Sequence, residues 1–401
     1  MSSLERKIKF NISNINYYTV NQNTDYRFKA NALSLINETY ILISENLITM
    51  MKTISSDFLI ELGESALQFP ETLDTAEKIV KIFFDIETTK NNFYIRALLI
   101  KAQVEAKNVE KKNLKAEDAI TQVKLALVNV QKSIELIAKP ENKQKYGYLI
   151  YNSSIITFNI LKKYFKSNWS KNFWEIIEKL SNFMEEIDDI DYNWRLRFLV
   201  KLAQCLIDAD KKPEGSKALD KIADLLKKKG ESEFQEELFR YRIHLSKDNT
   251  GALGNIKKEA DGIPESRGYK YIYTLQCIKT GVIPENAVEK EIQSFIGVIY
   301  PDFFKVIADN SLSIKIDPWR ADLLAEAGYL CIRSKLYSKS FILNLNFYNK
   351  CLIIIFSSCS EHNGFLNKIE IKFIKRKNLL REYTIATYNY QTRKCNIDYY
   401  Y

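Results

Sequence analysis

Apolar residues recur along most of this chain at the spacing of three and four residues that marks one buried face of an α-helix. The pattern is clearest in residues 116–139, where the apolar positions are Ile120, Val123, Leu127, Val130, Ile134 and Ile137. Two shorter runs, 57–69 and 73–86, are separated only by a turn at Pro70, and short turns force neighbouring helices to pack. We therefore expect antiparallel helical hairpins.

The same pattern predicts helices through the rest of the chain, up to about residue 338. Their expected ranges are 93–108, 145–166, 170–187, 194–209, 214–229, 231–245, 269–278, 285–299 and 321–336. The prolines all fall between the runs, where a fixed φ and a missing backbone donor disturb a helix least. Residues 1–30 are polar, with Asn and Tyr but no clear period, and are expected to form an irregular arm. The glycine-rich residues 249–268 are expected to form a hinge.

An internal repeat is present within this helical pattern. Trp194-Arg195 and Trp319-Arg320 are followed, at identical spacing, by Leu202-Ala203 and Ala327-Gly328. A looser third copy shares a constant offset of 101 residues, close to three units of about 34 residues. The matched positions of that copy are Arg96 with Arg197, Leu98 with Leu199, and Ala102-Gln103 with Ala203-Gln204.

Small residues stand where two paired helices must approach closely. Ala203 is followed 12 residues later by Gly215, and Gly328 is followed 12 residues later by Ser340. Tetratricopeptide hairpins carry small residues at this spacing, although Trp194 and Trp319 stand five residues before the usual aromatic position. The sequence thus predicts an all-α fold, a right-handed α-solenoid of irregular tetratricopeptide-like hairpins.

The expected organisation has four parts. Residues 1–30 are the irregular arm, 31–250 the helical-repeat region, and 251–338 continued repeats after the glycine-rich hinge. Residues 339–401 lack a helical period and are expected to be a basic tail of low order, or an alternative end that is not native to the fold.

The distribution of charge argues against nucleic-acid binding. The net charge is +9, but residues 339–401 alone contribute +6, and the preceding 338 residues only +3. A protein that binds a phosphate backbone needs its basic residues gathered on the folded surface.

The inventory of reactive residues argues against an enzyme, a cofactor and a metal site. There are six Cys without a CxxC pair and only two His, and the chain contains no GxxxxGK[ST], GxGxxG, HExxH or GxSxG motif. Asp189, Asp191 and Asn193 resemble the start of a calcium loop, but its sixth and twelfth positions hold Trp194 and Val200. We interpret this segment as a turn that caps the next helix. Cys205, Cys277 and Cys331 lie in apolar runs and are expected to be small buried hydrophobes.

No secretory signal or membrane-spanning run is present in the sequence, so we expect a reduced, intracellular compartment and no membrane partner. Repeat scaffolds of this kind present extended surfaces to other proteins.

Three segments resemble one known family. They run from Tyr148-Leu149-Ile150-Tyr151 to Lys166, from Asn193-Trp194-Arg195 to Ala209, and from Trp319-Arg320 to Gly328. Together they resemble the N-terminal tetratricopeptide region of the cilia- and flagella-associated protein 46 family. The resemblance covers roughly residues 57–337. Family members are much longer, and this chain departs from their pattern after Ser338.

The resemblance implies a non-enzymatic, structural subunit of the central apparatus of the ciliary axoneme, involved in cilium movement. Its implied partners are other central-apparatus projection subunits and calmodulin, and its implied location is the cytoplasm, cytoskeleton and cilium axoneme. Two alternatives remain open: a cytoplasmic tetratricopeptide adaptor that binds peptides, and an RNA-binding helical repeat.

If the best two repeat units bind partners through their first helices, repeat geometry selects six side chains. The candidate partner-binding residues are Arg197, Gln204, Asp208, Asp322, Tyr329 and Arg333.

Overall fold

The structure is a computed structural model. It describes residues 3–21, 26–46, 55–112, 114–187, 190–229, 234–263, 268–284 and 286–292, with residues 323, 326, 327, 329 and 330. The chain divides into two compact units, Met1–Gln235 and Glu236–Tyr401. The boundary therefore lies before the hinge predicted at residues 249–268.

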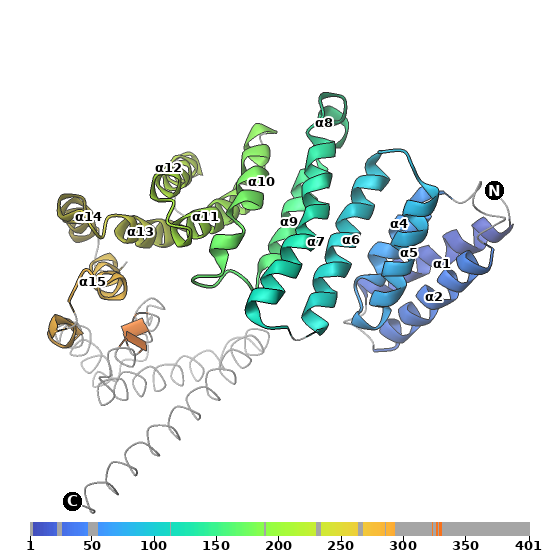
Figure 1. Ribbon diagram of the computed structural model, residues 1–401, viewed down its shortest axis with the longest axis horizontal. Helices are drawn as coiled ribbons and strands as arrows, with labels where there is room; N and C mark the ends of the chain where they lie inside the picture. Colours follow the sequence, from blue (N-terminus) through green and yellow to red (C-terminus); the bar gives the residue numbers. More distant parts are fainter. Residues whose placement is uncertain are drawn as a thin grey trace, which may run out of the picture. The chain divides into compact units, whose positions relative to one another are not determined.

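The first unit is a succession of helical hairpins (Figure 1). Its elements are α1 (Ser3–Val20), α2 (Tyr26–Glu45), α4 (Ser56–Ala66), η1 (Pro70–Thr72), α5 (Leu73–Ile86), α6 (Asn92–Lys111), α7 (Ala116–Ile137), α8 (Pro140–Tyr146), α9 (Leu149–Leu161), η2 (Ser170–Asn172), α10 (Trp174–Glu186), α11 (Tyr192–Asp208) and α12 (Lys212–Lys229). Helices pair as α1/α2, α4/α5, α6/α7, α9/α10 and α11/α12, and each pair packs on the next. The described fold is all-α, a solenoid of irregular hairpins, as the sequence predicts.

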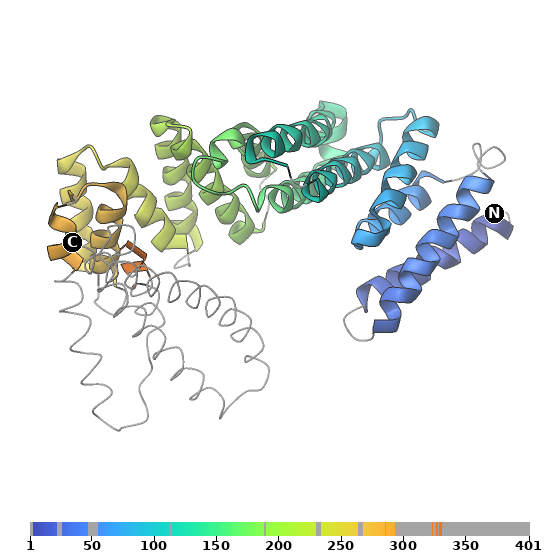
Figure 2. The same cartoon turned by 60° about the horizontal axis from the view of Figure 1, so that its bottom comes forward.

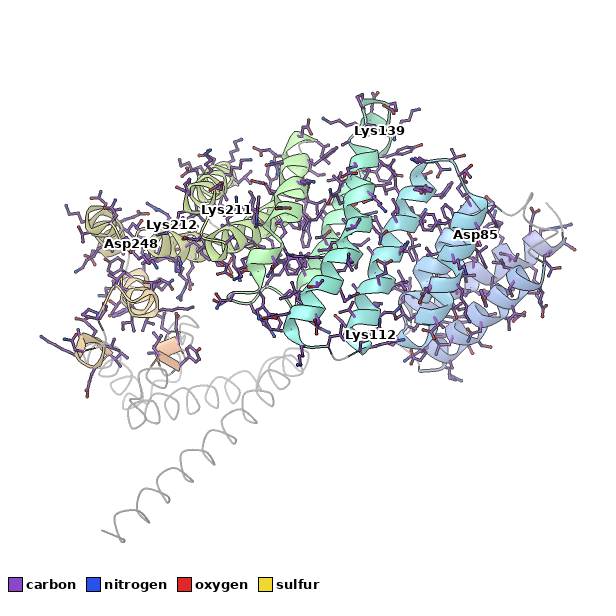
Figure 3. The ribbon with its side chains drawn as sticks, in the orientation of Figure 1. Asp85, Lys112, Lys139, Lys211, Lys212 and Asp248 are labelled. Carbon is purple, nitrogen blue, oxygen red and sulfur yellow. The ribbon has the colours of Figure 1, made fainter. Side chains whose placement is uncertain are left out.

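The hairpins are antiparallel. Figure 3 labels Lys112 just after α6 and Lys139 just before α8, at opposite ends of the α6/α7 pair. Figure 2 shows α1 and α2, the two helices in the deepest blue, running alongside each other. Within the described residues, no helix is both long and apolar enough to cross a membrane.

Small residues lie buried where the first helices of the hairpins approach their neighbours. Ala102 on α6, Ser153 on α9 and Ala203 on α11 are all fully buried. On α4 the small residue is Gly63, where a Cβ would lie 3.3 Å from Ile100 Cδ1. The offset of 101 residues thus joins two equivalent positions, because Ala102 and Ala203 are both fully buried on the first helix of a hairpin.

The second helix of the α11/α12 pair also follows the predicted spacing. Gly215 and Leu219 on α12 are both buried. Gly215, the small residue that follows Ala203 after 12 positions, is thus buried, as a contact position between paired helices requires.

The prediction of an irregular arm over residues 1–30 is wrong. Residues 3–20 form α1, which buries Ile8, Asn11, Ile12 and Ile15, and α2 begins at Tyr26. The buried positions follow helical spacing, but one of them is polar. Asn11 Nδ2 donates a hydrogen bond to Thr39 Oγ1 on α2 at 3.1 Å, which allows an amide to occupy the core.

The glycine-rich segment also differs from its prediction. Residues 250–262 form α14 rather than a hinge, with Leu253, Ile256 and Ala260 buried. Asn249 accepts a hydrogen bond from the Ala252 backbone nitrogen at 3.0 Å and so caps the helix. Burial at spacings of three and four outweighs the weak helix propensity of glycine at this place.

Two of the predicted long helices are interrupted. The pattern predicts one helix over residues 145–166, but α8 ends at Tyr146 and α9 begins at Leu149. Gly147 lies between them, and a Cβ there would be 2.7 Å from the carbonyl oxygen of Lys143. Residues 170–187 likewise divide into η2 and α10.

The second unit has its own core. Its described helices are α13 (Phe234–Leu245), α14 (Thr250–Gly262) and α15 (Tyr269–Thr280), with helical residues at 286–292. Phe239, Ile243, Leu253, Leu275 and Ile292 belong to one buried cluster, which Ala327 and Leu330 also join. The predicted tail, residues 339–401, lies outside the described residues.

Candidate protein-interaction surface

The start of α11 is fixed by a cap and by a contact from α9. Asp191 accepts a hydrogen bond from the Trp194 backbone nitrogen at 2.9 Å. Its second carboxylate oxygen accepts one from the Tyr151 hydroxyl at 2.8 Å. Asp191 therefore caps the helix, which confirms the interpretation of this acidic turn. Asp189 lies outside the described residues.

Trp194 joins the first helices of two successive hairpins. Its indole nitrogen donates to Ser154 Oγ on α9 at 2.7 Å. Its ring meets Phe158 edge to face at 5.2 Å between centroids. This combination of a polar and an aromatic contact holds α11 against α9 in one orientation.

The exposed face of α11 presents Arg197, opposite the buried residues Leu199 and Ala203. An arginine on such a face can bind a carboxylate in a bidentate arrangement. Its counterpart on α6, Arg96, binds a carboxylate of the chain in this way. Arg96 Nε and Nη2 donate to the two carboxylate oxygens of Glu64 at 2.9 and 2.7 Å. This contact, ahead of the burial that opposes it, raises the pKa of the Arg96 guanidinium.

Gln204 and Asp208 form hydrogen bonds within the chain. Gln204 Nε2 donates to the Phe165 carbonyl oxygen at 3.4 Å, and Gln204 Oε1 accepts from Lys201 Nζ at 3.2 Å. The hydroxyl of Ser170 donates to Asp208. Both side chains therefore brace the segment between α9 and α10, a role that the repeat pattern does not indicate.

The candidates of the second repeat unit are only partly described. Tyr329 is 58% exposed, and Ala327 of the predicted small pair is fully buried. Asp322 and Arg333, with Trp319, Arg320 and Gly328, lie outside the described residues. Their selection as partner-binding residues remains a prediction.

The cysteines of the described helices are packing residues. Cys205 on α11 and Cys277 on α15 are buried and unpaired, as the apolar runs predict. Burial raises the pKa of the Cys205 thiol to about 12, with a further contribution from Asp208. The thiol is therefore protonated at neutral pH and is a poor nucleophile. Cys331 lies outside the described residues.

A groove lies between α1 and α4, the first helices of the first two hairpins. This groove between α1 and α4 has a volume of about 720 Å³. Its lining is mixed, with acidic, polar and apolar side chains: Glu5, Lys9, Ile12, Ser13, Asn16, Ser55, Asp57, Phe58 and Glu61. We refer to it as the α1/α4 groove. The sequence pattern does not indicate it, because that pattern predicts an irregular arm where α1 forms one wall.

A smaller hollow of about 140 Å³ lies between α10, α11 and α12. Two of the charged side chains that line it, Glu185 and Lys221, form an ion pair. Lys221 Nζ lies 2.6 Å from Glu185 Oε2 and 3.2 Å from Asn182 Oδ1. Lys211, labelled with Lys212 in Figure 3 at the turn into α12, lies 4.1 Å from the centre of the Trp174 ring. These contacts stabilise the turn and the hairpin.

The part of the chain that the structure describes has no cluster suited to a metal ion. It contains no group of three or more His, Cys, Asp or Glu side chains arranged to hold one.

No protein-family model matches the chain. Among solved structures, the chain is similar to a circular tandem repeat protein with novel repeat topology and enhanced subunit contact surfaces. The sequence identity is 12%, and the match covers 90% of this chain and 99% of that chain, with a TM-score of 0.27. A superposition of that quality carries no argument about function, so the architecture rests on the helices described above.

Proposed function

We propose that this chain is a non-catalytic protein-binding scaffold. The observation that supports the proposal is the succession of hairpins in the first unit, in which each pair packs on the next. Repeated stacking of this kind presents long, exposed helix faces to other proteins. On α11 such a face carries the exposed Arg197.

The finer proposal is that the scaffold is a structural subunit of the axonemal central apparatus and takes part in cilium movement. It is supported by the resemblance of residues 148–166, 193–209 and 319–328 to the cilia- and flagella-associated protein 46 family. Its proposed partners are other projection subunits and calmodulin.

Localisation of the full-length tagged protein in ciliated cells tests the finer proposal. We expect the protein to lie along the axoneme and to remain with the central apparatus after detergent extraction of the membrane. A diffuse cytoplasmic distribution would contradict the ciliary role and favour the peptide-binding adaptor. Binding to RNA that weakens steeply with salt would instead favour the RNA-binding repeat.

Charge reversal on α11 tests the proposed surface. We expect Arg197→Glu to weaken capture of purified central-apparatus proteins by the immobilised full chain, while far-UV circular dichroism stays unchanged. Lys217→Glu, at an exposed position of α12, makes the same change in charge on a second helix and serves as the control. Equal capture by the wild type and Arg197→Glu would remove this face from the proposed function.

A further inference from the structure

The lining of the α1/α4 groove combines apolar side chains with a net negative charge. Phe58 and Ile12 are buried at 7% and 3% exposure and form apolar parts of its lining. Glu5, Asp57 and Glu61 contribute three carboxylates, and Lys9 contributes one ammonium group. The lining is therefore net negative in a chain whose total charge is +9.

Asp57 and Glu61 are the distinctive pair in this lining. They stand four residues apart on α4, so their side chains lie on the same helix face, where like charges destabilise a helix slightly. Neither carboxylate forms an ion pair within the described residues. Glu64, one turn further along α4, is by contrast bound by Arg96 at 2.7 Å.

One oxygen of Asp57 is buried without a partner. Asp57 Oδ1 is inaccessible to solvent and accepts no hydrogen bond from the described residues. A buried acceptor left without a donor destabilises the folded chain. Because this oxygen is closed to solvent, a donor in the groove reaches it only if the Asp57 side chain rotates, and such a donor would then supply the hydrogen bond that Oδ1 lacks.

The opposite wall of the groove offers polar groups that suit a polypeptide. Ser13 and Asn16 on α1 are exposed and line the groove, and Asn16 Oδ1 accepts a hydrogen bond from Ser65 Oγ at 3.2 Å. The Asn16 amide nitrogen and the Ser13 hydroxyl are groups that can bind backbone carbonyl and N–H groups.

We infer that the α1/α4 groove binds an extended basic segment of a partner protein, with a lysine or arginine side chain seated between Asp57 and Glu61. The methylene stem of that side chain would lie on Phe58 and Ile12, since long cationic side chains bury their stems along apolar surface. Its head group would donate to the two carboxylates in charge-assisted hydrogen bonds.

Charge and size support this occupant over others. A nucleic acid would meet three carboxylates, which repel phosphate. A volume of about 720 Å³ lies within the range of about 300–1,000 Å³ that is typical of ligand-binding clefts, so the groove has room for a long side chain. Arg197 does not line the groove, so a test that excludes binding at one of the two surfaces leaves the proposal for the other surface standing.

Fluorescence anisotropy with the full chain tests the inference. The probe is a short fluorescein-labelled peptide of alternating arginine and leucine. The matched peptide carries citrulline, which keeps the shape of arginine without its charge. We expect the wild type to bind the arginine peptide at least about tenfold more tightly, as two hydrogen bonds to charged groups would allow. Equal binding of the two peptides would overturn the inference.

Variants locate the site. Asp57→Asn combined with Glu61→Gln should abolish the preference for arginine. Glu117→Gln combined with Asp118→Asn makes the same charge change at exposed positions of α7 and should leave the preference intact. Equal losses in the two double variants would mean diffuse attraction to the whole surface and would also overturn the inference.

A substitution on α1, the opposite side of the groove, tests the site without removing any carboxylate of α4. Ser13→Arg places a cation in the groove from the exposed side of α1 and should weaken binding of the arginine peptide about tenfold. Ser34→Arg, at an exposed position of α2, is its control. Unchanged binding by Ser13→Arg, with both variants folded by circular dichroism, would place the peptide elsewhere and refute the assignment.

Discussion

The indole nitrogen of Trp194 on α11 donates a hydrogen bond to the hydroxyl of Ser154 on α9, across 2.7 Å. Tyr151 and Asp191 form a second link between the same two segments at 2.8 Å. The tryptophan that opens the sequence repeat is thus a connector between successive hairpins. Its polar atom and its ring both contribute to holding them together.

Trp194→Phe should lower the free energy of unfolding by about 1 kcal/mol, because an aromatic ring remains while the donor is lost. Trp194→Ala should cost about 3 kcal/mol or more, since the aromatic contacts with Phe158 are lost as well. Urea unfolding followed by circular dichroism measures both. Trp169→Phe is the control, because no hydrogen bond is formed by the Trp169 indole nitrogen within the described residues. A loss as large in Trp169→Phe would contradict the assigned role of the hydrogen bond.

Gly63→Leu should destabilise the first unit by about 1–3 kcal/mol, because the new side chain would overpack the contact of α4 with its neighbours. A Cβ alone would already stand 3.3 Å from Ile100 Cδ1 and 3.6 Å from Ile79 Cγ2. Thermal unfolding of the full chain is the measurement. A wild-type melting temperature in this variant would show that the helices can move apart freely, against the close packing described.

Gly254→Ala should act in the opposite direction. Gly254 lies within α14, and apart from the backbone of its own helix no atom lies within 4 Å of a Cβ built there. Alanine should therefore raise the free energy of unfolding by about 0.5–1 kcal/mol through helix propensity and a less flexible unfolded chain. If residues 250–262 formed a flexible hinge instead, this substitution would have no such effect on denaturant unfolding.

Glu105→Gln should stabilise the protein at neutral pH. Burial raises the pKa of the Glu105 carboxyl, Glu77 adds to the rise, and Lys101 and a hydrogen bond from Asn129 oppose it. Because the folded-state pKa lies above the unfolded one, ionisation is disfavoured in the folded protein. The resulting loss of stability grows as the pH rises through these values, and it vanishes below about pH 4.

A glutamine side chain at this position would keep an acceptor for Asn129 without carrying the charge, so the Glu105→Gln variant should be more stable than the wild type at pH 7. Because the Glu105 side chain is partly exposed, the gain should be below about 1 kcal/mol. Urea unfolding between about pH 3.5 and pH 7 follows it across the range where carboxyl groups titrate. Glu117→Gln, at an exposed position of α7, is the control. If the free energy of unfolding rose equally, and with the same dependence on pH, in both variants, burial of Glu105 would not be the cause.

Much of the helical architecture could be predicted from periodicity alone. The stripe from Ile120 to Ile137 lies on α7, whose bounds are Ala116–Ile137, and the range predicted for α5 is the one observed. These helices bury apolar residues on one face only. Spacing is therefore sufficient to find them, and the short turn at Pro70 is sufficient to pair them.

The first hairpin escapes prediction for a physical reason. One of the four buried residues of α1 is Asn11, whose partner Thr39 is 28 residues away on another helix. A polar core residue satisfied over such a distance leaves no trace in local spacing. The α1/α4 groove is lined on one side by α1, so a sequence analysis that misses α1 also misses the groove. The bracing roles of Gln204 and Asp208 are equally invisible in the sequence, because they depend on contacts with Phe165 and Ser170.

The buried hydrogen bond between Asn11 and Thr39 also limits how the first two helices can slide. Both residues are almost inaccessible to solvent, at 4% and 0% exposure. A shift of α1 by one turn along α2 would leave most isoleucines facing apolar neighbours. It would, however, leave the Asn11 amide buried without its hydrogen-bond partner, at a cost of about 1–3 kcal/mol. Isoleucines alone would tolerate several alignments of similar energy. The hydrogen bond between the Asn11 amide and the Thr39 hydroxyl therefore favours one register of α1 on α2. This register determines which side chains of α1 face α4.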